Sequence, residues 1–349
     1  MVSRFRELDA LRGIAALFVV LFHFTMNREV SKYGFHLGVT GVDLFFIISG
    51  FVIFMSIQKV SSVLEFAVNR FTRLYPTYWT CVTITFLFVI YNLSTQGKPE
   101  EISTMHYLAN MTMFQYNLRV PNLDGSYWTM IFEMGFYVFI GLLFSVNRLK
   151  NIIPIGVGVL CLVAAYELLP DSGFANSFNK LLYYVPFFRS FPLFFAGIVF
   201  YKITTSEKTI WYYYLLIIGC FAVQIIPHDN GAFITHPEYI SMLAVYFILF
   251  FLFAHHKLNF IISKPTLFLG KISFALYLIH QYICYEVIIP RMLAHGFSFW
   301  LAASLSLLFS IGVATIITFY IEIPFGKRIN NRLRIVLGLK KKQLVSESK

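Results

Sequence analysis

The sequence predicts an all-α integral membrane protein, a helical bundle with about ten transmembrane helices and both termini in the cytoplasm. Of the 349 residues, 58% are hydrophobic and only 13% are charged, whereas a soluble domain is about half apolar and about a quarter charged. Phe occurs 40 times and Tyr 21 times, as expected for lipid-facing helices with aromatic belts. No charged or Pro/Gly/Ser-rich linker divides the chain, so we expect one membrane domain, residues 1–326, and a basic cytoplasmic tail, 327–349.

Ten apolar segments have the length that a helix needs to cross the hydrocarbon core, about 20 residues with some tolerance for tilt. Barrel strands are excluded because the segments are too long and too uniformly apolar to alternate between two faces. In chain order the predicted spans are 8–26, 39–58, 75–93, 127–146, 151–169, 184–203, 211–227, 238–255, 272–290 and 298–320.

The basic residues predict the orientation of these spans. With a cytoplasmic N-terminus, the inside segments hold 20 of the 28 Lys and Arg and the outside segments hold seven, which follows the positive-inside rule. The net charge of +11 is then explained by topology and by anionic membrane lipids, and no nucleic acid partner is expected. The four cysteines each stand alone in an apolar segment, so no metal site is expected.

The first span carries ionisable residues where charge is expensive. A charged side chain at the centre of a membrane helix costs about 2.5–3.5 kcal/mol, so it usually has a partner or a function. Arg12 and His23 are separated by 11 positions, about three turns, which places them on one helical face. Asp9 precedes Arg12 by three residues and can pair with it.

Later spans carry further titratable groups. Asp43 and Glu133 are expected in the outer half of the membrane at a depth similar to that of His23, and His280 is expected nearer the middle. Tyr137 follows Glu133 by one turn. A His close to carboxylates can act as an acid–base centre, because its pKa is near neutrality and a carboxylate can fix its tautomer. A structural polar network is the alternative for each residue alone, but together they favour function.

Arg70 and Arg73 lie three residues apart just before the third span, on the predicted cytoplasmic side. On a helix they face the same way, and such a pair suits a phosphorylated ligand through bidentate hydrogen bonds. A positive-inside anchor would look the same, and the pair alone favours that simpler interpretation.

These residues, in this order, resemble the acyltransferase 3 family of membrane O-acyltransferases over about residues 4–326. Residues 6–15 with His23 are similar to the opening signature, in which the Arg and the His are both required for activity. Residues 41–51 resemble the second signature, and Arg70, Arg73 and Pro76 resemble the third. The remaining motif residues are Trp128, Glu133, Tyr137, Tyr277, His280 and Glu322.

Departures from the family pattern are mild. Thr129 and Met130 replace a usual Ser-Leu, and Phe274 stands where Tyr is common. The pattern is closest to that of stand-alone exopolysaccharide or O-antigen acetylases. Some relatives carry a fused extracytoplasmic domain, which we do not expect here because only residues 327–349 follow the closing motif.

The resemblance implies ten spans in a bacterial cytoplasmic (inner) membrane, an acyl-coenzyme A donor such as acetyl-CoA, and a glycan or lipid-linked sugar acceptor. It implies that Arg70 and Arg73 hold the donor phosphates, and it makes His23, Arg12, Asp43 and Glu133 the catalytic candidates. Neutral His23 would take the proton of the sugar hydroxyl, or His23 or a tyrosine would carry the acyl group briefly.

Two other functions stay open from the residues. Buried His, Asp and Glu side chains can form a proton relay in a secondary transporter, although no inverted repeat or pair of broken helices is evident. An acyltransferase that acts on a small free metabolite would show the same motifs.

Overall fold

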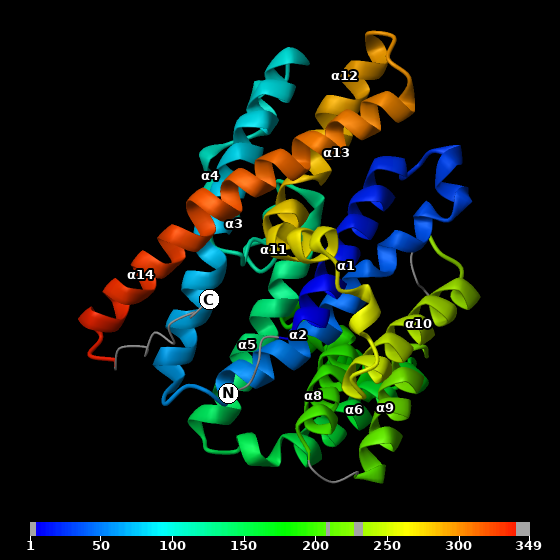
Figure 1. The fold of residues 1–349 in the computed structure, drawn as a ribbon, viewed down its shortest axis with the longest axis vertical. Coiled ribbons are helices and arrows are strands. Elements are labelled where there is room, and N and C mark those ends of the chain that lie inside the picture. Colours follow the sequence, from blue (N-terminus) through cyan, green and yellow to red (C-terminus); the bar gives the residue numbers. More distant parts are fainter. Residues whose placement is uncertain (1–4, 207–209, 227–232, 340–349) are drawn as a thin grey trace.

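The structure, a computed structural model, describes residues 5–206, 210–226 and 233–339, and every regular element in these ranges is a helix (Figure 1). The prediction of an all-α polytopic membrane protein is confirmed. The helices are α1 (Arg6–Thr25), α2 (Gly41–Ile57), α3 (Val63–Thr95), α4 (Thr104–Met111), α5 (Met130–Ser145), α6 (Ile152–Leu168), α7 (Gly173–Tyr184), α8 (Phe191–Thr205), α9 (Trp211–Gln224), α10 (His236–Ala254), α11 (Lys264–Ile279), α12 (Ile289–Ala294), α13 (Phe299–Ile316) and α14 (Ile323–Val336).

Eight helical stretches in the described ranges are long and apolar enough to cross a membrane, and each corresponds to one predicted span. Some include a short helical turn before or after the α-helix itself. The stretches are Arg6–Thr25, Phe35–Ile57, Val63–Thr95, Gly125–Ser145, Leu149–Leu168, Pro186–Thr205, His236–Ala254 and Phe299–Val336. The expectation that both termini are cytoplasmic stays a prediction.

Two of the ten predicted spans differ from the structure. The segment 211–227 contains α9, which has only 14 residues and is shorter than a usual span. The segment 272–290 is not one straight helix, because α11 ends at Ile279 and the helical residues Gln281–Ala294 follow at an angle of 57°. Residues Gln281–Ile288 have the wider π-helical hydrogen bonding, which commonly accompanies a bend. Apolar length alone does not reveal such a break.

Helix α1 lies in the middle of the molecule, in close contact with α11 and α2 (Figure 1). A Cβ atom added to Gly270 of α11 would lie 1.9 Å from the backbone oxygen of Asp9, and one added to Gly13 would lie 2.5 Å from the nitrogen of Gly270. Small residues allow this close approach of backbones, as is common between membrane helices. The contact fixes how Arg12 and His23 on α1 face the residues of α11.

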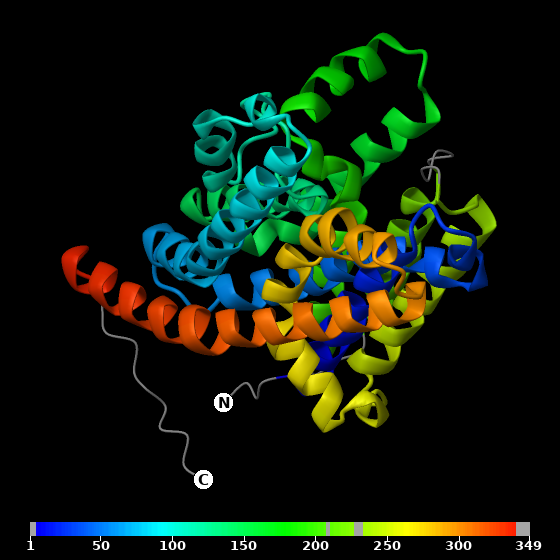
Figure 2. The same ribbon diagram turned by 90° about the horizontal axis from the view of Figure 1, so that it is seen from above.

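Two helical stretches are longer than a membrane requires. α3 has 33 residues and Phe299–Val336 has 38, so both extend beyond the hydrocarbon core. α14 packs beside the first half of α3 (Figures 1 and 2). Arg334 pairs with Glu65 at 2.6 Å, and Asn330 donates to Asn69 at 3.0 Å. These contacts support the part of α3 that carries Arg70 and Arg73, and α14 runs through the predicted domain boundary at residue 326.

Candidate active site

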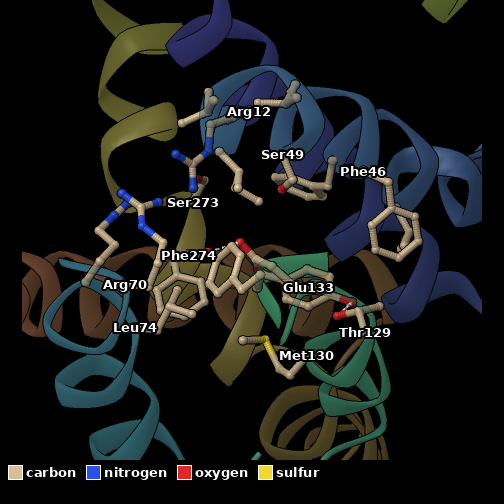
Figure 3. A pocket seen from close by; sticks show the side chains of 18 residues that line it. Arg12, Phe46, Ser49, Arg70, Leu74, Thr129, Met130, Glu133, Ser273 and Phe274 are labelled. Atoms are coloured by element: carbon tan, nitrogen blue, oxygen red, sulfur yellow. Dashed lines mark hydrogen bonds between the residues drawn. The ribbon is translucent and has the colours of Figure 1, made fainter. Parts of the chain in front are cut away.

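A cavity of about 170 Å³ lies between α1, α2, α3, α5 and α11 (Figure 3). Its charged lining residues are Arg12, Arg70, Arg73 and Glu133, that is, three guanidinium groups and one carboxylate. Figure 3 shows Arg12 and Arg70 pointing into the same end, whereas Phe46 and Thr129 lie towards the other. The excess of positive charge favours an anionic ligand at the arginine end.

The three arginines are neutralised to different degrees. Arg73 forms an ion pair with Glu322, a residue that is only 8% exposed and that lies between α13 and α14 in the long helical stretch Phe299–Val336. Arg12 and Arg70 form no ion pair with an acidic side chain among the described residues. Arg70 lies over the rings of Phe66 and Tyr137, with 5.8 Å from its Cζ to each ring centroid. Among the described residues, no acidic side chain therefore neutralises Arg12 or Arg70 through an ion pair.

Glu133 belongs to this arginine cavity. It accepts a hydrogen bond from the hydroxyl of Tyr137, one turn along α5, at 2.5 Å. His23 and Asp43 are not among the residues that line the cavity. The sequence grouped Glu133 with His23 and Asp43 by depth, and the structure does not, because similar depth does not mean that two side chains share a face of the bundle.

His23 instead contacts His280, the residue at which the α11 span breaks. The His280 Nε2 atom lies 3.0 Å from Nδ1 of His23, and His280 is completely buried. The His280 Nδ1 atom is 2.9 Å from the carbonyl oxygen of Tyr277, and the His23 Nδ1 atom is 2.9 Å from that of Val19. The structure thus joins two histidines that the sequence singled out separately.

The break at His280 is held by a residue that the sequence did not single out. Asp124 is completely buried, and its carboxylate accepts a hydrogen bond from the backbone N–H of Tyr282 at 2.7 Å. The same carboxylate accepts from the N–H and the hydroxyl of Ser126, at 2.8 and 2.6 Å. Burial raises the pKa of Asp124 to about 6, and these hydrogen bonds act against that rise. Asp124 directly precedes the helical turn Gly125–Thr129, and Asp is a preferred N-cap residue. A search of the sequence for N-caps could therefore have identified it.

Tyr277 lies between the cavity and the histidines. It lines the cavity, and its hydroxyl is 3.0 Å from that of Thr129. On the other side, its ring centroid is 5.9 Å from that of His280. The arginine cavity and the histidine pair are therefore neighbouring parts of one region, separated by one aromatic ring.

The remaining predicted residues lie elsewhere. Asp43 interacts electrostatically with Tyr239 and Tyr246 of α10. Trp128 is 44% exposed and is not among the cavity lining residues. Asp9 lies in the first turn of α1, where that helix approaches α11.

A helical membrane bundle that holds a basic cavity beside a pair of histidines, one of them completely buried, has the parts of a membrane-embedded transferase. Comparison with known families agrees, since the family model described as an acyltransferase domain matches residues 5–319. The chain belongs to this acyltransferase family. The predictions of the family and of an acyltransferase are confirmed.

Three curated relatives illustrate the similarity. ORF330 of Acidianus two-tailed virus, described as a candidate acetyltransferase, is 25% identical over 77% of this chain and 80% of its own length. The O-acetyltransferase OatA of Staphylococcus aureus is 27% identical over 78% of this chain and 49% of its own. The exopolysaccharide production protein ExoZ of Rhizobium meliloti is 32% identical over 46% of this chain and 51% of its own. The chain thus matches about half the length of OatA and of ExoZ. No solved structure matches it.

Proposed function

We propose that this protein moves an acyl group, acetyl in the simplest case, from a coenzyme A thioester to a hydroxyl of a glycan or lipid-linked sugar. The observation that carries the proposal is the position of the arginine cavity beside the histidine pair, on helices α1 and α11. The names of OatA and ExoZ support acetyl transfer and a polysaccharide acceptor. They favour this function over transfer to a small metabolite, and family membership favours transfer over transport.

The phosphate end of the donor would bind at the arginine end of the cavity. Coenzyme A carries phosphates on a long, thin arm that ends in the thioester, and Arg12 and Arg70, which form no ion pair within the described residues, lie at one end of the cavity. Charge-assisted hydrogen bonds from Arg to phosphate are strong and geometrically specific. The cavity of about 170 Å³ is smaller than the roughly 300–1,000 Å³ of pockets that enclose a whole ligand, so it would take only part of the donor.

His23 would act as the general base. The proton of the sugar hydroxyl passes to Nε2 of His23 while the sugar oxygen attacks the carbonyl carbon of the thioester. The carbon–sulfur bond then breaks, and the thiolate of coenzyme A leaves with the electron pair and takes up the proton. Arg12, about three helical turns from His23 on α1, would help hold the donor. The products are a sugar ester and free coenzyme A, and the thioester would reach His23 past Tyr277.

The proposal is tested with the full-length protein in bilayer nanodiscs supplied with isotope-labelled acetyl-CoA and lipid-linked oligosaccharide from a polysaccharide-producing bacterium. We expect labelled acetyl esters on the sugar by mass spectrometry, together with release of free coenzyme A. Small hydroxylated metabolites serve as competing acceptors in a parallel reaction. Labelling of the metabolites alone would contradict the glycan acceptor, and failure to bind acetyl-CoA would contradict the donor.

A further inference from the structure

One ring of the histidine pair, His280, does not line the arginine cavity, yet it is completely buried beside the proposed base. Nothing in the proposed chemistry uses His280 directly, and it is not among the residues that line the cavity. A buried imidazole at a 57° break in a span calls for an explanation, because a continuous apolar helix would have been the simpler structure.

Backbone carbonyl groups determine which ring nitrogens of the pair carry a hydrogen, because a carbonyl oxygen can only accept a hydrogen bond. Nδ1 of His280 faces the carbonyl oxygens of Tyr277 and Leu276, at 2.9 and 3.2 Å, so it must carry a hydrogen. Nε2 of a neutral His280 then has a lone pair. Nδ1 of His23 faces this lone pair at 3.0 Å and the carbonyl oxygen of Val19 at 2.9 Å, so it must donate.

One ring nitrogen of the pair, Nε2 of His23, is not involved in these contacts. With its hydrogen on Nδ1, neutral His23 has a lone pair on Nε2, and that atom has no hydrogen-bond partner among the described residues. This is the state that a general base needs, since the lone pair must be ready to accept a proton. The Val19 carbonyl belongs to the same helix as His23. His280 therefore supplies the contact that ties the ring to a second helix.

We infer that His280 is a positioning residue for His23, and that the break after α11 exists to hold it there. This inference rests on the proposed function, in which His23 takes the hydroxyl proton. Nε2 of His280 accepts the Nδ1–H of His23, keeps the reactive lone pair of His23 on Nε2, and stabilises the ring when it becomes positively charged. The role is the one that an orienting group has towards the histidine of a hydrolase triad.

The surrounding structure maintains this geometry. Asp124 accepts from the N–H of Tyr282, which lies two residues after His280, and so fixes where the second half of the broken span begins. π-Helical turns such as Gln281–Ile288 are frequent at functional sites. The position of His280 is thus determined from both sides of the break, by α11 before it and by the Asp124 contact after it.

The hydrogen bond itself can be observed without any assay of activity. In full-length protein with ¹⁵N-labelled histidine, reconstituted in bilayers, a nitrogen–nitrogen scalar coupling should connect Nδ1 of His23 with Nε2 of His280. The coupling should disappear in His280→Leu and persist in His36→Leu. His36 is a suitable control because its Nε2 makes an interhelical hydrogen bond of the same length, 3.0 Å, to Glu238 outside the site. An unmodified protein without this coupling would overturn the inference.

The catalytic role is tested by acetyl transfer to the glycan in the same preparations. We expect His280→Leu to lower kcat about 10–100-fold, as for other groups that orient a reactive residue, with the KM for acetyl-CoA unchanged. His280→Gln keeps an acceptor near the ε position and should recover most of the loss, and His36→Leu should match the unmodified protein. Equal rates for His280→Leu and the unmodified protein would show that the bond is only structural.

A double variant separates positioning from general damage to the fold. If His280 acts through His23, His280→Leu combined with His23→Ala should be no slower than His23→Ala alone, because the group it orients is gone. Losses that multiply would overturn the inference. If the unmodified protein binds acetyl-CoA and shows the coupling but transfers no acyl group, the proposed function fails instead.

Discussion

The two ends of α1 hold their ionisable residues in opposite ways. At the Arg12 end, three guanidinium groups and one carboxylate line the cavity, and even with Arg73 paired to Glu322 the positive charge is in excess. At the His23 end, the ring nitrogens of the pair are hydrogen-bonded to each other and to backbone carbonyls, except Nε2 of His23, which has no partner in the described part of the chain. A binding region benefits from unmatched charge, whereas a general base benefits from fixed protons and one lone pair that is free to accept a proton.

The largest effect is expected at the histidine end. His23→Ala removes the proposed base and should lower acyl transfer about 10²–10⁴-fold while acetyl-CoA binding persists. His23→Gln should be nearly as inactive, because an amide cannot take up a proton near neutral pH. The measurement is acetylated glycan formed in membranes at matched protein levels, with His36→Ala as the control. If His23→Gln kept more than about a tenth of the activity, a general base at this position would be ruled out.

At the arginine end, Arg70→Ala should mainly weaken donor binding. A hydrogen bond to a charged group contributes about 1.5–3 kcal/mol, which corresponds to roughly 10–150-fold in the Kd for coenzyme A. Titration of the purified protein with coenzyme A measures this directly, and saturating donor should restore most of kcat. An unchanged Kd would mean that Arg70 is only a topological anchor. A larger loss of kcat than of affinity would place Arg70 with the reactive group.

The two ends of α1 also show which features the sequence predicts and which it does not. Eight spans follow from apolar length, because about 20 apolar residues have few alternatives to a membrane helix. The prediction that Arg12, His23 and Arg70 are functional rests on the cost of charge in a membrane and on the family motifs. Their grouping does not follow, since helical spacing orders residues along one helix but says little about which faces of different helices meet.

The bend at His280 and the role of Asp124 are the clearest examples of this limit. The segment 272–290 is uniformly apolar apart from a few residues, and its sequence resembles that of a straight span. Tyr282, two residues after the bend, donates its backbone N–H to the carboxylate of Asp124, 158 positions earlier in the chain, and no local pattern encodes this contact. Asp124 itself lies outside the predicted spans, so the cost of burying its charge was not visible from the sequence.

Asp124→Ala should have an effect of intermediate size, and it should lower both the stability of the protein and the activity that depends on the histidine pair. It leaves the buried N–H of Ser126 and the partly buried N–H of Tyr282 without their acceptor, and an unsatisfied buried donor costs about 1–3 kcal/mol. We expect a lower unfolding midpoint in detergent and a reduced kcat with unchanged donor affinity. Asp171→Asn, which alters an exposed carboxyl group, is the control and should have no effect. Normal activity in Asp124→Ala would mean that the break keeps its geometry without this contact.

The smallest effect is expected for Arg73, and it tests whether unmatched charge is what makes the cavity a binding region. Arg73 lines the same cavity as Arg70, on the same face of α3, but it is already paired with Glu322. A donor phosphate must therefore compete with a carboxylate for Arg73, so the net gain should resemble that of an ordinary ion pair, at most about 1 kcal/mol or roughly fivefold in Kd. Coenzyme A titrations of Arg73→Ala and Arg70→Ala in the same lipid preparation make the comparison, with unfolding midpoints to show that both variants are folded. A greater loss for Arg73→Ala would reverse the ranking. In that case Arg73, oriented by Glu322, would be the main phosphate ligand. Donor binding would then not depend on an arginine that lacks an ion pair.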